Sequence, residues 1–124
     1  FRDKPRRLRV MIVDDNADAA ESLALLLDID GHQVRTELSG SAALAAAAEF
    51  MPDVVFCDLG LPGVSGHDVA ASVRSDPRFA ATTLVALTGW GSDEDRRRAR
   101  DAGFDFHLTK PASAAAIDQI LLQI

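Results

Sequence analysis

The chain contains a single cysteine, no apolar run long enough to cross a bilayer and no excess of basic side chains. With only Cys57 present, an internal disulfide is excluded, and this cysteine usage fits a reducing, cytoplasmic compartment. Because a membrane-spanning helix needs roughly 18 apolar residues, we expect no membrane insertion, although a parent chain could tether the domain to a membrane sensor. A formal net charge of −6 gives a nucleic-acid partner no electrostatic support, so we expect no nucleic-acid contact by this domain.

A length of 124 residues, 48 % of them apolar, suits one compact domain. We expect residues 1–7 to be a linker or lead-in and residues 8–124 to be the folded domain, because the first residues are polar and Arg-rich. The first residue is Phe rather than Met, which favours a piece cut from a longer protein.

Short β-branched or apolar runs alternate with longer stretches at helical period. The expected strands are Leu8–Val13, Gln33–Glu37, Asp53–Cys57, Thr83–Leu87 and Asp105–Leu108. The expected helices are Ala17–Asp30, Gly40–Glu49, Val64–Ser75, Ser92–Ala102 and Ser113–Gln123. Five strand–helix units predict an α/β fold of the flavodoxin-like (βα)5 type, a three-layer sandwich with a five-stranded parallel sheet in the order 2-1-3-4-5.

Three carboxylates are expected to meet at one edge of this sheet. Asp14 and Asp15 follow the first strand and Asp58 follows the third, and ligands bind between the carboxyl ends of these two strands in such an architecture. Crowded carboxylates repel one another and call for a cation. Oxygen ligands without His or Cys favour Mg²⁺, with Mn²⁺ as the alternative.

Two further strand ends supply groups that suit a phosphoryl ligand. Thr88 ends the fourth strand with a hydroxyl that can donate a hydrogen bond, and Lys110 follows the fifth strand with a mobile point charge. Asp58 would then be the nucleophile that forms an acyl phosphate, while Lys110, Thr88 and the metal stabilise charge on the transferring group.

Four motifs, taken together, resemble the response-regulator receiver family, whose members are CheY-like. The motifs are Val13-Asp14-Asp15-Asn16, the run from Asp53 to Gly66, Leu87-Thr88-Gly89 and Leu108-Thr109-Lys110-Pro111. The resemblance covers nearly the whole chain, residues 8 to 123. It implies a phospho-accepting domain of a two-component (His-Asp) system, which takes a phosphoryl group from the phosphohistidine of a histidine kinase or phosphotransfer domain. A conformational switch would follow, read by a partner or by another domain of the parent chain.

The resemblance also implies a role for each matching residue. Asp58 would be the phosphoacceptor, and Asp15 and Asp58 would bind Mg²⁺ directly. Asp14 would bind it mainly through water, and the backbone carbonyl of Gly60 would be a further ligand. The implied contacts to the phosphoryl group come from Thr88 and Lys110, and the Lys110–Pro111 peptide bond would be cis.

Three positions depart from the residues that the family most often carries. Gly60 and Trp90 would flank the phosphoryl group, with Gly60 leaving room for attacking water and Trp90 partly covering the site. His107 stands where the family has an aromatic switch residue, and an imidazole there would titrate near neutrality. A solvent-exposed His107 without a signalling role is the alternative.

Other functions are less well supported. A phosphatase of the haloacid-dehalogenase type needs Asp-x-Asp at its nucleophile, whereas Leu59 and Gly60 follow Asp58. A flavodoxin-like cofactor binder needs a phosphate cradle where this chain has acidic residues after its first strand. A pseudo-receiver that docks partners without chemistry would not need the intact functional positions. We therefore expect no conventional enzyme but a domain that catalyses its own aspartate phosphorylation and dephosphorylation.

The parent of the domain is a separate expectation. The Arg-rich lead-in and the Gly89-Trp90-Gly91 segment are similar to receivers fused to hybrid sensor histidine kinases, which would place kinase domains in the same chain. Homodimerisation through the fourth helix, fifth strand and fifth helix is an open alternative, although no unusual apolar stripe supports it.

Overall fold

A computed structural model describes residues 7–89 and 92–124 of the chain. Its sheet has five parallel strands in the order β2-β1-β3-β4-β5, which confirms the predicted topology. The strands are β1 (Arg9–Val13), β2 (Gln33–Glu37), β3 (Val54–Asp58), β4 (Thr83–Thr88) and β5 (Phe106–Thr109). Each bound lies within one residue of the expected one. Asp58 and Thr88 belong to their strands instead of following them, because Asp58 still pairs with Leu87 and Thr88 with Thr109.

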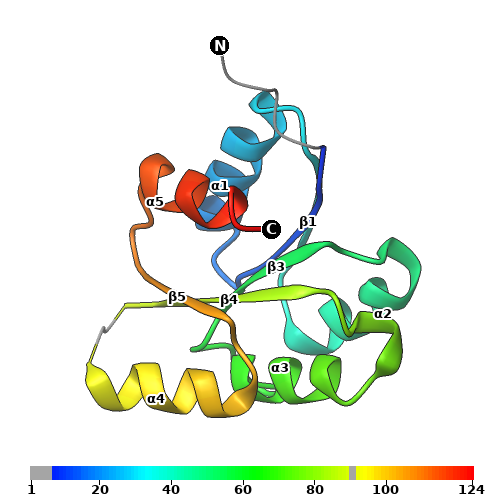
Figure 1. Cartoon of the computed structure of the whole chain (residues 1–124), viewed down its shortest axis with the longest axis vertical. Helices are drawn as coiled ribbons and strands as arrows, with labels where there is room; N and C mark the ends of the chain where they lie inside the picture. The colour runs from blue at the N-terminus through cyan, green and yellow to red at the C-terminus, as the bar shows by residue number, and fades with distance from the viewer. Residues whose placement is uncertain (1–6, 90–91) are drawn as a thin grey trace.

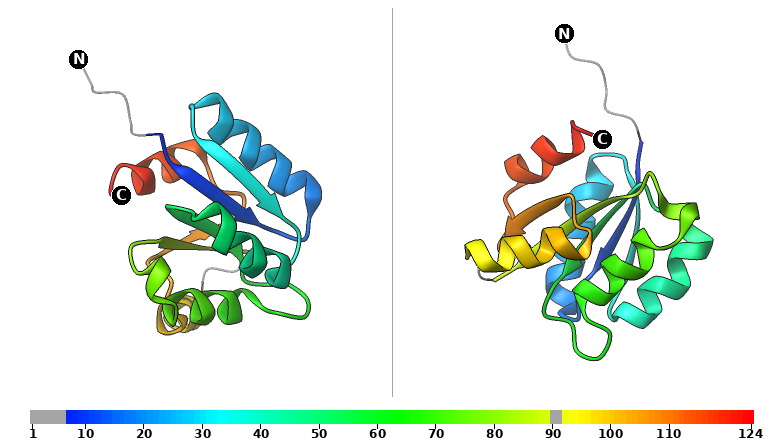
Figure 2. Two further views of the ribbon diagram at one scale, coloured as in Figure 1. Left: turned by 90° about the vertical axis from the view of Figure 1, so that its right-hand side faces the viewer. Right: turned by 60° about the horizontal axis from the view of Figure 1, so that its bottom comes forward.

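Helices cover both faces of the sheet, as a parallel sheet requires. They are α1 (Ala17–Ile29), α2 (Gly40–Phe50), α3 (Gly66–Arg74), α4 (Asp93–Ala102) and α5 (Ala114–Leu121). Helices α1 and α5 lie on one face, and α2, α3 and α4 lie in a row on the other (Figures 1 and 2). Within the described residues, no helix has the length and apolarity that crossing a membrane demands.

Side-chain caps decide where the helices begin. Ser65, Ser92 and Ser113 each accept a hydrogen bond from the backbone N–H three residues ahead, so they precede their helices rather than start them. At α3 the Asp68 carboxylate also accepts from the Ser65 N–H, and this capping box makes α3 begin at Gly66, not at the predicted Val64. The left-handed Gly103, with φ of 117°, ends α4 where a stop was expected.

One short element was not predicted from the sequence, a 3₁₀ turn at Pro77–Phe79 called η1. Asp76 caps it by accepting from the Arg78 N–H, and Pro77 occupies a first position that needs no backbone donor. Phe79, 5 % exposed, anchors the turn in the core beneath α3. Turns this short carry no periodicity, so the pattern of apolar residues could not reveal it.

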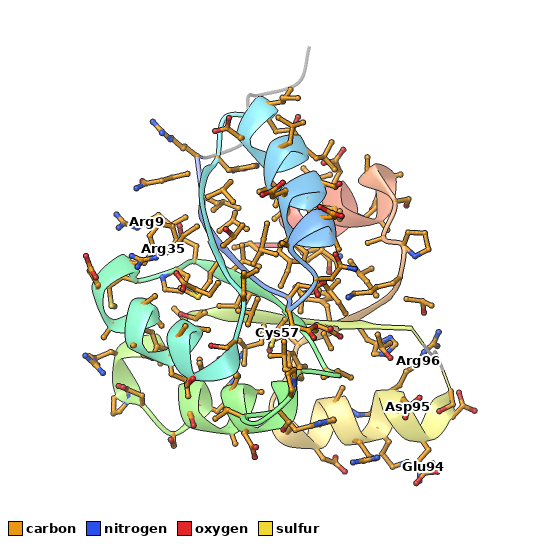
Figure 3. The ribbon with its side chains drawn as sticks, turned by 180° about the vertical axis from the view of Figure 1, so that it is seen from behind. Arg9, Arg35, Cys57, Glu94, Asp95 and Arg96 are labelled. Atoms are coloured by element: carbon orange, nitrogen blue, oxygen red, sulfur yellow. The ribbon has the colours of Figure 1, made fainter. Side chains whose placement is uncertain are left out.

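Strand alternation separates two apolar cores. Phe56 packs with α1 and α5, whereas its neighbour Cys57 packs with α2, α3 and α4. Cys57 is fully buried near the middle of the molecule (Figure 3). Burial, together with the charges of Asp58 and Asp14, raises the pKa of its thiol to about 12. The thiol is therefore a core group with no accessible thiolate.

Candidate functional site

Three carboxylates converge at the carboxyl ends of β1 and β3. Val13 pairs with Cys57 in the sheet, so the residues that follow, Asp14 and Asp58, lie side by side. One ligand atom from each of Asp14, Asp15 and Asp58 lies within 4.8 Å of the other two. Asp14 is buried, Asp58 is partly buried and Asp15 is exposed, so the cluster opens to solvent on the side of Asp15. The arrangement is the one expected from the strand ends.

Backbone donors orient two of these carboxylates. The N–H of Asn16 donates to Oδ1 of Asp14 at 3.0 Å, and the N–H of Gly60 donates to Oδ1 of Asp58 at 3.1 Å. Each bond uses one oxygen of its carboxylate, and the two Oδ2 atoms lie near the ammonium group of Lys110. Asn16 also caps α1 by accepting from the Ala19 N–H, so the turn that carries Asp14 and Asp15 is tied to the helix start.

Lys110 places its ammonium among the carboxylates. Its Nζ donates to Oδ2 of Asp14 at 2.7 Å and lies 3.5 Å from Oδ2 of Asp58. Burial by itself would lower the pKa of Lys110, but the hydrogen bond to Asp14 and the charges of Asp58 and Asp14 outweigh it and raise the pKa above its ordinary value. Lys110 is therefore charged throughout the physiological range. The peptide bond from Lys110 to Pro111 is cis, the conformation that the family resemblance implies.

Thr88 lies at the end of β4 beside this group. It is 7 % exposed, and its carbonyl accepts from the Lys110 N–H at 2.7 Å, so the β4 end and the lysine-bearing turn are joined. Trp90, expected to flank the pocket, lies outside the described residues. Gly60, the other expected flanking residue, is exposed, and a Cβ built there would come no closer than 3.7 Å to Oδ1 of Asp58. A side chain would fit at Gly60, so its absence leaves open space beside Asp58.

His107 lies on β5 opposite Ala86 and faces α4. Its ring is half-buried, and within the described structure its Nε2 atom is buried without a hydrogen-bond partner. Burial lowers the pKa of His107, the nearby charge of Arg96 lowers it further, and Asp95 opposes both. Figure 3 shows Arg96 on the side of α4 toward the sheet and Glu94 on the opposite side. His107 is therefore partly buried rather than solvent-exposed, and whether it has a switch role stays a prediction.

The donor set fits a hard divalent cation. Its members are carboxylates, with no His or Cys in the cluster among the described residues, and such oxygen ligands suit Mg²⁺ or Mn²⁺ rather than zinc. Asp14, Asp15 and Asp58 would hold the ion, and the carbonyl of Gly60 is the further ligand that the resemblance implies. Lys110 balances part of the negative charge of the same cluster.

The chain matches the response regulator receiver domain over residues 10–122. It belongs to this family. Its relatives include the transcriptional regulatory protein KdpE of Mycobacterium tuberculosis, 39 % identical over 102 residues, which are 82 % of this chain and 44 % of the relative. Protein PilG of Pseudomonas aeruginosa is 31 % identical, with 86 % of this chain and 78 % of that protein covered. This receiver domain thus spans less than half the length of KdpE.

Solved receiver structures share the fold. Vibrio cholerae chemotaxis protein CheY4 superposes with a TM-score of 0.89 at 25 % identity, covering 96 % of this chain and 99 % of that one. The receiver domain of Saccharomyces cerevisiae Ssk1, solved with the histidine phosphotransfer protein Ypd1, superposes with a TM-score of 0.88 at 26 % identity. That match covers 98 % of this chain and 90 % of the other. The acidic pocket of this chain fits the phosphorylation site of such a domain.

A groove next to the acidic pocket was not predicted. It holds about 550 Å³ between α1 and the segment that leads into α5. Ser22, Leu23 and Leu26 of α1 line it on one side, Pro111 and Ala112 line it on the other, and Asp14 and Lys110 are also among its lining residues. The spacing of the α1 residues was visible in the sequence, but whether α5 packs against them depends on the path of the chain after Pro111.

Proposed function

We propose that Asp58 of this receiver domain accepts a phosphoryl group from a phosphohistidine, with a divalent cation, Mg²⁺ or Mn²⁺, held by Asp14, Asp15 and Asp58. The observation that supports the proposal best is the convergence of three carboxylates on the Lys110 ammonium, 2.7 Å from Asp14 and 3.5 Å from Asp58. A carboxylate nucleophile and the incoming phosphoryl group are both negatively charged, so they need positive charge nearby. The Lys110 ammonium and the cation held by the three carboxylates would supply it.

In the proposed reaction, an Oδ2 lone pair of Asp58 attacks phosphorus as the P–N bond to the donor imidazole breaks. The imidazole leaves with the bonding electron pair, and an acyl phosphate forms on Asp58. The cation would neutralise charge on the phosphoryl oxygens. Lys110 would turn from Asp14 toward the new phosphoryl oxygens, and the Thr88 hydroxyl would donate to another. Loss of the phosphoryl group by water attack beside Gly60 would return the carboxylate, so the domain would catalyse changes only in itself.

The partner proposed for this step is a histidine kinase or a phosphotransfer domain. The groove beside the pocket supports this proposal, because a helix that carries the donor histidine could lie along α1 with its side chain near Asp58. The similar Ssk1 receiver was solved with a histidine phosphotransfer protein. We further propose that the domain belongs to a hybrid histidine kinase, which would supply the donor domains in the same chain. The receiver would then lie in the cytoplasm, tethered through the parent chain to a membrane sensor.

Phosphorylation would be read through a shape change near α4. Movement of Thr88 toward a phosphoryl group would change the space beside His107, whose ring faces α4. A partner or a parent-chain domain would recognise the changed face. Homodimerisation through α4, β5 and α5 is one form that such recognition could take, and no nucleic-acid contact is proposed for the domain itself.

The test is phosphorylation with acetyl phosphate and with a phosphorylated histidine phosphotransfer domain, each with and without Mg²⁺. Intact-protein mass spectrometry should show one added phosphoryl group in the native chain and none in Asp58→Asn. Asp101→Asn, the same change at an exposed position of α4, is the matched control and should react normally. Equal labelling of the Asp58→Asn chain would show that the acceptor is another residue. No labelling of the native chain by either donor would favour a pseudo-receiver.

A further inference from the structure

The loop between β3 and α3, residues 59–65, supports both Asp58 and Gly60. Its first N–H, from Leu59, donates to the Leu87 carbonyl at 3.0 Å, and its Gly60 N–H donates to the Asp58 carboxylate. Leu61 is 6 % exposed and packs into the core, while Ser65 closes the loop as the cap of α3. The position of the loop therefore sets where the Asp58 carboxylate and the Gly60 carbonyl point.

Two glycines outside the acidic cluster touch this loop so closely that a side chain does not fit. A Cβ built on Gly66 would lie 2.5 Å from the Asp58 carbonyl oxygen and 2.8 Å from Cα of Leu59. A Cβ built on Gly40 would lie 2.5 Å from the Val64 carbonyl oxygen. The atoms in conflict are mostly backbone, which cannot rotate away as a flexible side chain could.

Space, not backbone conformation, explains glycine at these two positions. Neither Gly40 nor Gly66 is among the residues with positive φ, in contrast to Gly31, Gly63 and Gly103. The other glycines of the pocket region are not crowded in this way: a Cβ at Gly60 would have 3.7 Å to its nearest neighbour, and one at Gly89 would meet nothing within 4 Å. A Cβ on Gly103 would also be crowded, 2.6 Å from Cγ of Arg74, but that atom belongs to a side chain. Close approach to backbone atoms is found at the first turns of α2 and α3, which begin at Gly40 and Gly66.

We propose that Gly66 and Gly40 are positioning residues for phosphoryl transfer at Asp58. By lacking a side chain, each lets the start of its helix close on the 59–65 loop, and together they hold the Asp58 backbone and the Gly60 carbonyl in place. The inference rests on the proposed function of Asp58, because it concerns the geometry of that same site. Neither glycine touches the phosphoryl group or the cation.

The two glycines act at different distances from the acceptor, so their effects should be graded. A methyl group at Gly66 presses on the backbone of Asp58 and Leu59 themselves. A methyl group at Gly40 presses on Val64, at the far end of the loop, and on the Val69 side chain at 3.0 Å. Because a misplacement of about 1 Å can cost about 10²-fold in rate, Gly66→Ala should show the larger loss and Gly40→Ala a smaller one.

The experiment compares Gly66→Ala, Gly40→Ala and Val73→Ala in the whole chain. Val73 is 3 % exposed on α3 and packs in the same core as the loop, but it lies two turns beyond the helix start, so its truncation destabilises the helix without pressing on the loop. For each variant we would measure Tm, the Kd for Mg²⁺ by calorimetry and the rate of phosphorylation by acetyl phosphate.

Outer-shell residues of metal sites typically affect affinity by about 10- to 100-fold, so Mg²⁺ affinity should fall by about that factor in Gly66→Ala. The loss of Mg²⁺ affinity should be larger in Gly66→Ala than in Val73→Ala, even if Val73→Ala lowers Tm as much or more. Wild-type affinity and rate in both folded glycine variants would overturn the inference, as would loss of affinity in strict proportion to Tm across all three. Failure of both glycine variants to fold would also overturn it, by showing that the glycines serve the fold alone. If the native chain takes no phosphoryl group, the proposed function fails, and the Mg²⁺ comparison still decides the positioning role.

Discussion

The Lys110 ammonium donates a 2.7 Å hydrogen bond to Oδ2 of Asp14, the buried member of the acidic cluster. These residues are 96 positions apart in the chain, yet their pairing sets the charge balance of the pocket before any phosphoryl group arrives. Oδ2 of Asp58 lies 3.5 Å from the same ammonium. The lysine therefore already contacts the residue to which the phosphoryl group would be attached.

Replacing Lys110 by alanine should lower stability and slow phosphorylation while tightening Mg²⁺ binding. Loss of a hydrogen bond to a charged group costs about 2 kcal/mol, and the cluster is left without the Lys110 ammonium until Mg²⁺ takes its place.

Because the folded pKa of Lys110 is raised, its stabilising effect should be full below pH 10.5 and be lost as the pH rises through the higher folded value. Chemical denaturation from pH 7 to 11 would check this. Lys110→Arg, which keeps the charge, should recover stability more than rate, and an unchanged rate in Lys110→Ala would remove the lysine from the mechanism.

Divalent cation should stabilise the native chain by mass action. Binding to the folded state alone adds about 2.7 kcal/mol at a concentration one hundred times Kd. Without metal, Asp58→Asn should be more stable than the native chain because one of three crowded charges is removed, and with metal this advantage should shrink or reverse. Calorimetric scans in Mg²⁺ and in EDTA measure both effects. Asp101→Asn should follow the native chain, and equal Mg²⁺ responses of Asp58→Asn and the native chain would contradict the proposed ligand set.

A charge placed in the groove should separate donor docking from chemistry. Ser22 is exposed on the α1 wall, so Ser22→Glu should leave phosphorylation by acetyl phosphate unchanged while slowing transfer from a phosphotransfer domain about tenfold, as loss of roughly 1.4 kcal/mol of docking energy implies. Ser72→Glu, on α3 across the sheet, serves as the control. Single-turnover transfer kinetics with the two donors make the comparison. Equal donor rates for both variants would place the docking surface elsewhere.

His107 should make the domain less stable in acid. Its folded pKa lies below the ordinary 6.5, so the unfolded chain binds the proton more readily. Stability should therefore fall as the pH drops through 6.5 and level off below the folded pKa. His107 lines a groove together with the charged residues Asp93, Arg96, Arg97 and Arg100 of α4, and Asp95 of the same helix also acts on its pKa. Thermal unfolding from pH 8 to 5 should show a smaller loss for His107→Phe than for the native chain; identical profiles would show that other groups govern the acid response.

Arg74 joins three segments at the end of the sheet far from the pocket. It donates to the Gly103 carbonyl at 2.9 Å and the Thr82 carbonyl at 2.8 Å, and it pairs with Asp105. Arg74→Ala should therefore destabilise the chain by about 2 kcal/mol, since two part-buried carbonyl acceptors lose a charged donor. Arg78→Ala is the control, because Arg78 pairs with Asp76 at the surface and should matter little. Urea unfolding of both variants provides the test, and equal stabilities would deny Arg74 a structural role.

Much of the fold could be predicted because its signals are local. Strand and helix periods located all five units, and the helix expected to end at Ala102 does end there, followed by Gly103 with a left-handed backbone. Errors arose at Ser92 and Ser113, where a capping side chain looks like the first helical residue until its hydrogen bond is seen. The turn at Pro77–Phe79 was missed because three residues have no period.

The sequence by itself determined that Asp14, Asp15 and Asp58 would meet, since parallel strands bring their carboxyl ends to one edge whatever the details of packing. Only the tertiary structure decided which partner Lys110 takes, how far the start of α3 closes on the loop after Asp58, and that a groove opens beside α1. It also decided that Nε2 of His107 is buried and has no hydrogen-bond partner among the residues that the structure describes. These features depend on contacts between segments far apart in the chain, and the distances that define them are set by packing, which no local pattern of residues records.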